Sequence, residues 1–159
     1  MLTSRAVEWP PSFYELREGK GCPICAEGRP DENRGGTRIF AGEVSDAYLR
    51  RDGIQRGYTF VTWRGRHVAE PTDLEPDEAA AYWGELLRVG RALEQHLQPV
   101  KLNYNILGNE VPHLHTHVIP RYADDPKPGW PFPFPEEEPP PHDEAQFRQD
   151  VEALRALLG

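Results

Sequence analysis

Cysteine and positive charge are both scarce in this chain of 159 residues. Its two cysteines, Cys22 and Cys25, are too few to stabilise a secreted fold of this size by disulfide bonds. Acidic residues outnumber basic ones by 26 to 18, and the net charge is −8. This balance argues against a nucleic-acid polymer as partner, because such binders carry a basic face. A small anionic substrate is still compatible with it, since a local cluster can be positive on an acidic protein.

Long apolar runs are absent as well. No segment is long and apolar enough to span a bilayer, and residues 1–16 lack the apolar core of a signal peptide. We therefore expect a cytoplasmic protein with no membrane partner. With 38% hydrophobic and 28% charged residues, the composition is typical of one globular domain with a real core.

The most informative stretch holds three histidines at alternate positions, His113, His115 and His117. β-Branched residues between and after them favour a strand, in which alternate side chains share one face. Alternate residues lie roughly 6–7 Å apart, so His113 and His115 can just reach one metal ion. His113 and His117 are twice as far apart and cannot, so at least one histidine has another task. A solvated histidine-rich strand is the plain alternative.

A second motif is the pair Cys22 and Cys25, two thiols that can grip one metal ion from a tight turn. A redox pair is the alternative, but the βαβ context of thioredoxin-like chemistry is missing. A metal would need two further ligands, and histidines are the candidates. His67 follows a strand-like run and can be one of them, or else a solvent-facing loop residue.

The remaining pattern predicts an arm, a meander, a long helix, a hairpin and a C-terminal helix. Its segments are an irregular arm at 1–20 with a helical turn near 12–17, strands at 37–42, 46–51 and 58–63, a helix at 72–98, a strand at 100–107 that turns through 108–112 into the histidine strand, a proline-rich segment at 123–141 and a helix at 143–158. The apolar stripe expected to bury the long helix is Ala79, Trp83, Leu86, Leu87, Gly90, Leu93 and Leu97. We divide the chain into a domain at 1–125 and a tail with a helix at 126–159, packed on that domain.

The stretch from His113 to Ile119 resembles the defining motif of the histidine triad (HIT) family of nucleotide hydrolases and transferases. The flanking Gly108–Pro112 and Pro120–Arg121 look like the bacterial branch described as diadenosine-tetraphosphate-hydrolase-like. The resemblance covers roughly residues 20–125. It implies an α+β, HIT-like fold, which has an antiparallel sheet of about five strands, one long central helix and a C-terminal helix. It also implies a homodimer.

The resemblance further implies a structural zinc site. Zinc-containing members use a Cys-x-x-Cys, a histidine after the strand and the first histidine of the triad, which here are Cys22, Cys25, His67 and His113. Two thiolates and two imidazoles make a closed tetrahedral site with no position for water. Such a site frees the other two histidines for chemistry.

The implied activity is hydrolysis or transfer at the α-phosphate of a nucleoside polyphosphate or phosphoramidate, such as diadenosine tetraphosphate. In the family the middle histidine is the nucleophile, which makes His115 the residue that forms a covalent nucleotidyl-histidine, with His117 contacting phosphate oxygens. Magnesium can accompany the nucleotide. Hydrogen bonds to phosphate are expected from Asn103, Asn105, Gly108 and Asn109. Arg121 is a candidate for offsetting substrate charge.

The sequence departs from the family pattern at several positions. Asn109 and Glu110 stand where the family often has Gln and Thr or Ser, and Tyr58 stands where many members have histidine. Asp52 is the nearest match to a ribose-binding aspartate. Two rival functions therefore stay open. One is a hydrolase in which the His-x-His pair holds a zinc-bound hydroxide. The other is a nucleotide-binding regulatory module with little turnover.

Overall fold

A computed structural model describes residues 8–159, so the first part of the expected N-terminal arm, residues 1–7, lies outside the described residues. The helices and strands are α1 (Pro11–Arg17), α2 (Pro23–Glu27), β1 (Glu32–Asn33), β2 (Gly36–Ala41), β3 (Ser45–Arg50), β4 (Thr59–Trp63), a 3-10 turn η1 (Pro71–Asp73), α3 (Pro76–Leu97), β5 (Lys101–Asn105), β6 (His115–Arg121) and α4 (Glu144–Leu158). Within this part of the chain, no helix combines the length and apolarity needed to cross a membrane.

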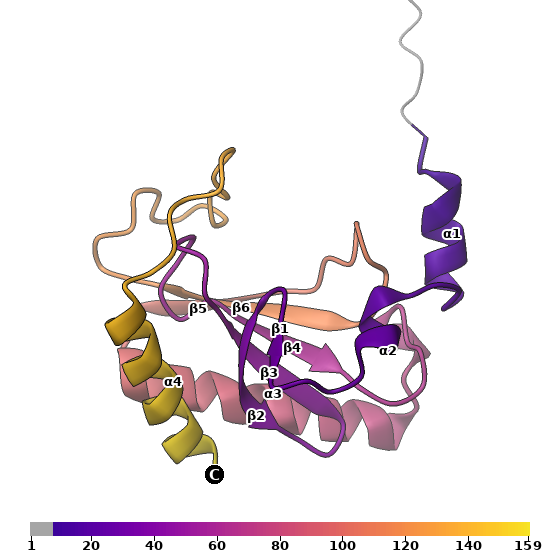
Figure 1. The fold of residues 1–159 in the computed structure, drawn as a ribbon, viewed down its shortest axis with the longest axis horizontal. Coiled ribbons are helices and arrows are strands. Elements are labelled where there is room, and N and C mark those ends of the chain that lie inside the picture. The colour runs from indigo at the N-terminus through magenta and orange to yellow at the C-terminus, as the bar shows by residue number, and fades with distance from the viewer. Residues whose placement is uncertain (1–7) are drawn as a thin grey trace, which may run out of the picture.

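The strands form one antiparallel sheet in the order β1-β2-β3-β4-β6-β5 (Figure 1). The α+β class and antiparallel sheet predicted from the sequence are confirmed. The sheet has six strands where about five were expected. The additional strand is the two-residue β1, in a segment for which no strand was predicted. This strand forms because the Asn33 side chain accepts hydrogen bonds from the backbone amides of Gly35 and Gly36. These bonds close a tight hairpin between β1 and β2.

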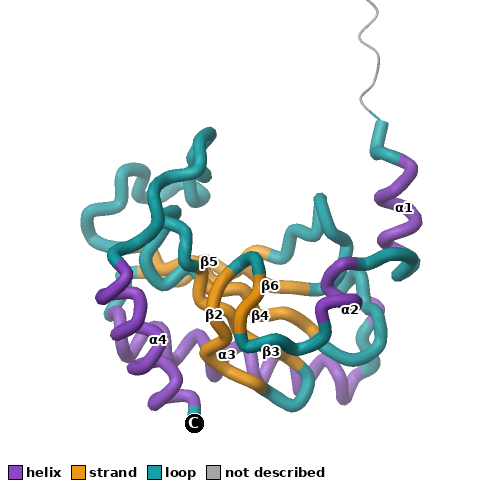
Figure 2. Tube along the Cα trace, in the orientation of Figure 1, coloured by secondary structure: helices purple, strands orange, loops and turns teal. Residues whose placement is uncertain are grey.

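Both long helices lie on the same face of the sheet, with loops gathered on the other side (Figure 2). Tyr82 and Leu86 of α3 are fully buried beneath the strands, together with Leu154 of α4. The predicted stripe of α3 is partly wrong. Leu86, Gly90 and Leu93 are buried as predicted. Trp83 and Leu87 are 42% and 41% exposed, because the buried face extends to Tyr82 and Val89 instead.

The long helix also begins later than predicted. The sequence suggested a start at residue 72, but α3 begins at Pro76, and η1 occupies the residues before it. The side chain of Glu75 accepts from the backbone of Glu78, and the Glu78 carboxylate accepts from the Glu75 amide. This capping box satisfies free amides at the helix end and sets the true boundary.

The tail and β6 are joined by Arg121. Its guanidinium donates to the Asp125 carboxylate, the Asn103 side chain and the carbonyl oxygens of Lys127 and Trp130. Arg121 is 7% exposed, and this network uses its donors. The prediction that it offsets substrate charge is therefore wrong, because the side chain anchors the proline-rich tail.

Candidate active site and metal centre

His115 and His117 project from β6 on the face away from α3. Thr116, between them, contacts the Tyr82 hydroxyl of α3 at 2.7 Å, so strand alternation places both histidines on the opposite side. Their ring centroids are 5.0 Å apart. His113 was predicted to lie on the same strand as the other two histidines. It lies before that strand instead, because β6 begins only at His115. Its ring is therefore free to turn toward the N-terminal arm.

The two strand histidines line an open cleft of about 1070 Å³. Its other lining residues come from α2, the β1–β2 turn, the ends of β3 and β4, the β5–β6 loop and the tail, namely Ile24, Glu27, Asn33, Arg34, Gly35, Arg50, Arg51, Asp52, Phe60, Thr62, Leu107, Gly108, Asn109, Glu110, Val111, Glu138, Pro139 and Pro141. This volume is at the upper end of ordinary small-molecule sites, which measure roughly 300–1,000 Å³.

The residues predicted to bind substrate divide into two groups. Gly108 and Asn109 line the cleft with the histidines, whereas Asn103 and Asn105 do not. Asn103 lies opposite Ile119 in the sheet and accepts a hydrogen bond from Arg121 at 2.8 Å. Asn105 lies opposite His117 in the register, at the end of β5.

The hydrogen bonds of His115 fix which of its nitrogens carries the proton. Its Nδ1 lies 2.7 Å from the backbone oxygen of His113, and a carbonyl oxygen can only accept. The proton therefore sits on Nδ1, which leaves Nε2 with a free lone pair. Burial lowers the pKa of His115, so the ring is neutral near pH 7.

His117 is held by a buried tyrosine. The Tyr58 hydroxyl lies 2.5 Å from His117 Nδ1, and Phe60 stacks edge-on against the same imidazole with centroids 4.7 Å apart. Burial lowers the pKa of His117 to about 3, helped by neighbouring His115 and Arg50. This ring is also neutral at physiological pH.

Four side chains form a group that could hold a metal ion, with ligand atoms within 4.8 Å of one another. They are Cys22, Cys25, His67 and His113, the four residues predicted from the sequence. Cys25 Sγ lies 3.3 Å from His67 Nδ1 and 3.4 Å from His113 Nδ1, and Cys22 Sγ lies 3.5 Å from His113 Nδ1. Sulfur and nitrogen ligands of a tetrahedral zinc ion lie about 3.5 Å apart, so the spacing fits that ion.

The outer nitrogens of both imidazoles donate to backbone oxygens. His113 Nε2 lies 2.7 Å from the Trp63 carbonyl, and His67 Nε2 lies 3.1 Å from that of Arg17. Each ring therefore carries its proton on Nε2 and turns the Nδ1 lone pair toward the cysteines. Burial lowers the pKa of His113 to about 4, which keeps it in the neutral form that metals bind.

The short helix α2, which carries Cys25, is held to the sheet by Arg64. This guanidinium donates to Asp46 at 2.9 Å, to Glu27 at 3.1 Å and to the Ile24 carbonyl at 3.3 Å. Asp46 is fully buried, and Arg29 also donates to it. No sequence pattern predicted this ion network, because its members are far apart in the chain.

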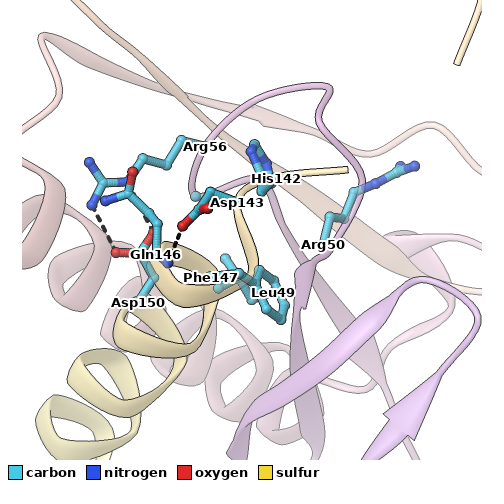
Figure 3. Close-up of a pocket in the computed structure, with 9 residues that line it drawn as sticks. Leu49, Arg50, Arg56, His142, Asp143, Gln146, Phe147 and Asp150 are labelled. Carbon is cyan, nitrogen blue, oxygen red and sulfur yellow. Dashed lines mark hydrogen bonds and ion pairs between the residues drawn. The ribbon is translucent and has the colours of Figure 1, made fainter. Parts of the chain in front are cut away.

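A second, smaller cavity of about 40 Å³ opens at the start of α4 (Figure 3). Four of its polar residues are already paired with one another. Arg56 reaches Asp150 at 2.9 Å, and Asp143 caps the helix by accepting from the Gln146 amide (Figure 3). The volume is far below the roughly 300 Å³ of the smallest usual ligand sites, so the cleft beside the histidines is the better candidate.

The cleft contains basic residues that no sequence motif marked. Arg34, Arg50 and Arg51 all line it. Arg50 donates to Asp52 at 2.6 Å, and Arg51 donates to Glu32 at 2.9 Å. The available signal was the Arg-Arg pair at the end of a predicted strand, but strand order was needed to place that pair near the histidines.

Comparisons with known proteins agree with this geometry. The sequence profile of the HIT domain matches residues 35–124, more than half of the chain. The curated Protein hit of Bacillus subtilis (strain 168) is 25% identical over 91 residues, 54% of this chain and 62% of that protein, so less than two thirds of the relative is spanned.

The matches to solved structures cover larger shares of both chains. A histidine triad protein from Bradyrhizobium japonicum has a TM-score of 0.68 at 29% identity, over 79% of this chain and 92% of that chain. A Zn-bound histidine triad family protein from Mycobacterium smegmatis has a TM-score of 0.58 at 24% identity, over 86% and 90% of the two chains. The second likeness shows the shared fold.

Proposed function

The chain belongs to the HIT domain family, whose members are commonly nucleotide hydrolases or transferases, and we propose that it cleaves a nucleotide substrate at the α-phosphate. The substrate class is a nucleoside polyphosphate or phosphoramidate, with diadenosine tetraphosphate as one example. The reaction passes through a nucleotide bound covalently to His115. Water or another acceptor then receives the nucleotide.

One observation carries this proposal, the free Nε2 of His115 in the cleft. The hydrogen bond from Nδ1 to the His113 carbonyl holds the ring with its other lone pair exposed, and burial keeps it neutral. In the first step Nε2 bonds to the α-phosphorus, and the bond from phosphorus to the leaving group breaks. In the second step the acceptor oxygen bonds to phosphorus and its proton passes to the solvent, the phosphorus–nitrogen bond breaks, and neutral His115 is restored.

The cleft offers guanidinium groups to a phosphate chain near His115, although four carboxylates, those of Glu27, Asp52, Glu110 and Glu138, line it as well. Three guanidinium groups line it, those of Arg34, Arg50 and Arg51. Arginine is well matched to phosphate oxygens because its planar donors bind two of them at once. Glu110 lines the same cleft, and a carboxylate repels phosphate, so we propose that it limits which leaving groups fit.

We assign the Cys22, Cys25, His67 and His113 cluster to a structural zinc ion. The donor set fills all four tetrahedral positions, the sulfur–nitrogen distances match, and a relative of the same fold is Zn-bound. The ion ties α2 to the turn after β4 and the turn before β6. Its role is to hold these segments, and the chemical step belongs to His115.

The test is pre-steady-state release of the leaving group from a fluorogenic adenylate ester, with intact mass measured after an acid-free quench. We expect a burst and an adenylyl adduct in the wild type, and neither in His115→Ala. The control is His96→Gln, in the last turn of α3. Glutamine keeps a hydrogen-bond donor for Asp150, so this variant should keep both the burst and the adduct.

Two results would redirect the assignment. Turnover that survives in His115→Ala and stops on chelation would favour a zinc-bound hydroxide as the nucleophile. AMP binding with no turnover in the wild type would favour a nucleotide-binding regulatory module.

A further inference from the structure

The buried contact between Tyr58 and His117 has no part in the steps described above. Building on the proposed function of the cleft, we propose that Tyr58 is a positioning residue, whose hydroxyl donates to His117 Nδ1 and thereby makes His117 Nε2 a fixed hydrogen-bond donor toward the substrate. Tyr58 lies just before β4, and His117 lies on the adjacent strand β6.

The direction of this hydrogen bond follows from the partners available. Tyr58 is fully buried, and among the described residues the acceptor that its hydroxyl contacts is His117 Nδ1 at 2.5 Å, whereas the neighbouring Arg50 guanidinium can only donate to it. If the imidazole donated instead, the phenol proton would be buried with no acceptor, which is unfavourable. Donation by the phenol satisfies both groups. A neutral imidazole has one N–H, so the proton of His117 must then sit on Nε2.

The surroundings of Tyr58 keep its phenol protonated and fixed in place. The Arg50 guanidinium lies 4.8 Å from the ring centroid on one side, and Phe132 and Phe134 of the tail pack against the ring at 6.4 and 6.3 Å. Burial raises the pKa of Tyr58 to about 12, against a smaller lowering by Arg50. The phenol is therefore a permanent donor near neutral pH.

A histidine at position 58 would not fix which nitrogen of His117 carries the proton. An imidazole both donates and accepts, so a pair of histidines can exchange roles or share a further proton. A phenol whose proton has a single acceptor favours one arrangement. The two strand histidines then have opposite character, with a lone pair on His115 Nε2 for attack and an N–H on His117 Nε2 for a phosphate oxygen.

The test compares Tyr58→Phe with Tyr82→Phe. Tyr82 is an equally buried tyrosine, and its hydroxyl contacts Thr116 and the Val61 carbonyl instead of a histidine. Long-range ¹H–¹⁵N spectra of the resting protein, assigned with His117→Gln, report which nitrogen of His117 is protonated. Rates with the adenylate ester are measured on the same samples, with folding checked by thermal unfolding.

We expect a protonated Nε2 on His117 in the wild type and in Tyr82→Phe, and a mixture of tautomers in Tyr58→Phe. The kcat of Tyr58→Phe should fall about tenfold with KM little changed, a smaller loss than the ~10²–10³-fold for direct removal of an oxyanion donor. A wild-type His117 protonated on Nδ1, or an unchanged spectrum in Tyr58→Phe, would overturn the proposal. The spectra are recorded without substrate, so the tautomer of His117 is tested independently of the nucleotide reaction.

Discussion

The Nδ1 atom of His115 lies 2.7 Å from the backbone oxygen of His113, so the proposed nucleophile is oriented by the backbone of a proposed metal ligand. The His113 ring points to the cysteines while its carbonyl points to His115. A single residue therefore connects the two sites. Loss of the metal should release this turn, and the catalytic effect should follow from the change in structure.

Metal removal is the first prediction. We expect about one zinc per chain, bound by two thiolates and two imidazoles, and a loss of stability on the order of several kcal/mol when it is removed. Zinc content by elemental analysis, thermal unfolding and initial rate are measured along a chelation time course. The rate should fall in step with unfolding. An immediate loss of rate while the fold is intact would contradict a structural ion.

The second prediction concerns pH. Burial lowers the pKa of His117 to about 3 in the folded protein, against about 6.5 for an exposed histidine. Between these values the unfolded chain binds a proton that the folded chain excludes, so stability rises with pH through this window and levels off above it. His117→Asn removes the titrating group. Unfolding of the variant should therefore take up about one proton fewer near pH 5.

Denaturant unfolding from pH 4 to 8 measures this difference as the slope of stability against pH. Equal slopes for the wild type and His117→Asn would show that the ring is already protonated in the folded state. That result would also remove the neutral His117 from the proposed site.

The third prediction concerns Arg64, which holds α2 against the sheet. Arg64→Ala removes a buried partner of Asp46 and the contact with the Ile24 carbonyl, and should cost about 3 kcal/mol. The control is Arg66→Ala, which breaks a surface ion pair with Glu78 and should destabilise the protein far less. Unfolding and zinc release to a chromogenic chelator are measured for both. Equal zinc release would show that the network does not support the metal centre.

The sequence predicted the parts of this fold that depend on local pattern. The alternation around His115 gives a strand, and the spacing of Leu86 and Leu93 gives a helix that buries these leucines. The helix register was ambiguous because Trp83 and Tyr82 are adjacent aromatic residues and either can begin an apolar stripe. Only packing against the sheet selects Tyr82, whose hydroxyl contacts the backbone of β4.

The site was harder to predict from the sequence, because its contacts join residues that are far apart in the chain. Strand order alone brings Arg50 of β3 into the same cleft as the histidine strand. The contact of Tyr58 with His117 joins residues 59 positions apart. The four residues of the candidate metal group were predicted through the family resemblance, which supplied two histidines as partners for the Cys-x-x-Cys pair. Asparagine and arginine have many uses in proteins, which is why the role predicted for Arg121 was wrong.

The last prediction is a homodimer that uses the exposed side of α3 and the edge strand β5. Trp83, Leu87 and Tyr104 are 42%, 41% and 39% exposed, and the Tyr104 ring lies over Gly90 of the same helix, which joins them into one apolar strip. Among the described strands, β5 ends the sheet beside this strip, with one edge unpaired. An unpaired edge next to exposed aromatics suits pairing with a second copy.

Sedimentation equilibrium tests this arrangement with two variants, each of which replaces an exposed tryptophan with glutamate. Trp83→Glu places a carboxylate in the strip and should shift the wild-type dimer to a monomer. Trp130→Glu changes a more exposed tryptophan, 72% accessible in the proline-rich tail, and should leave the dimer intact. A wild-type monomer would contradict the homodimer, and dissociation by Trp130→Glu alone would place the interface at the tail instead of α3.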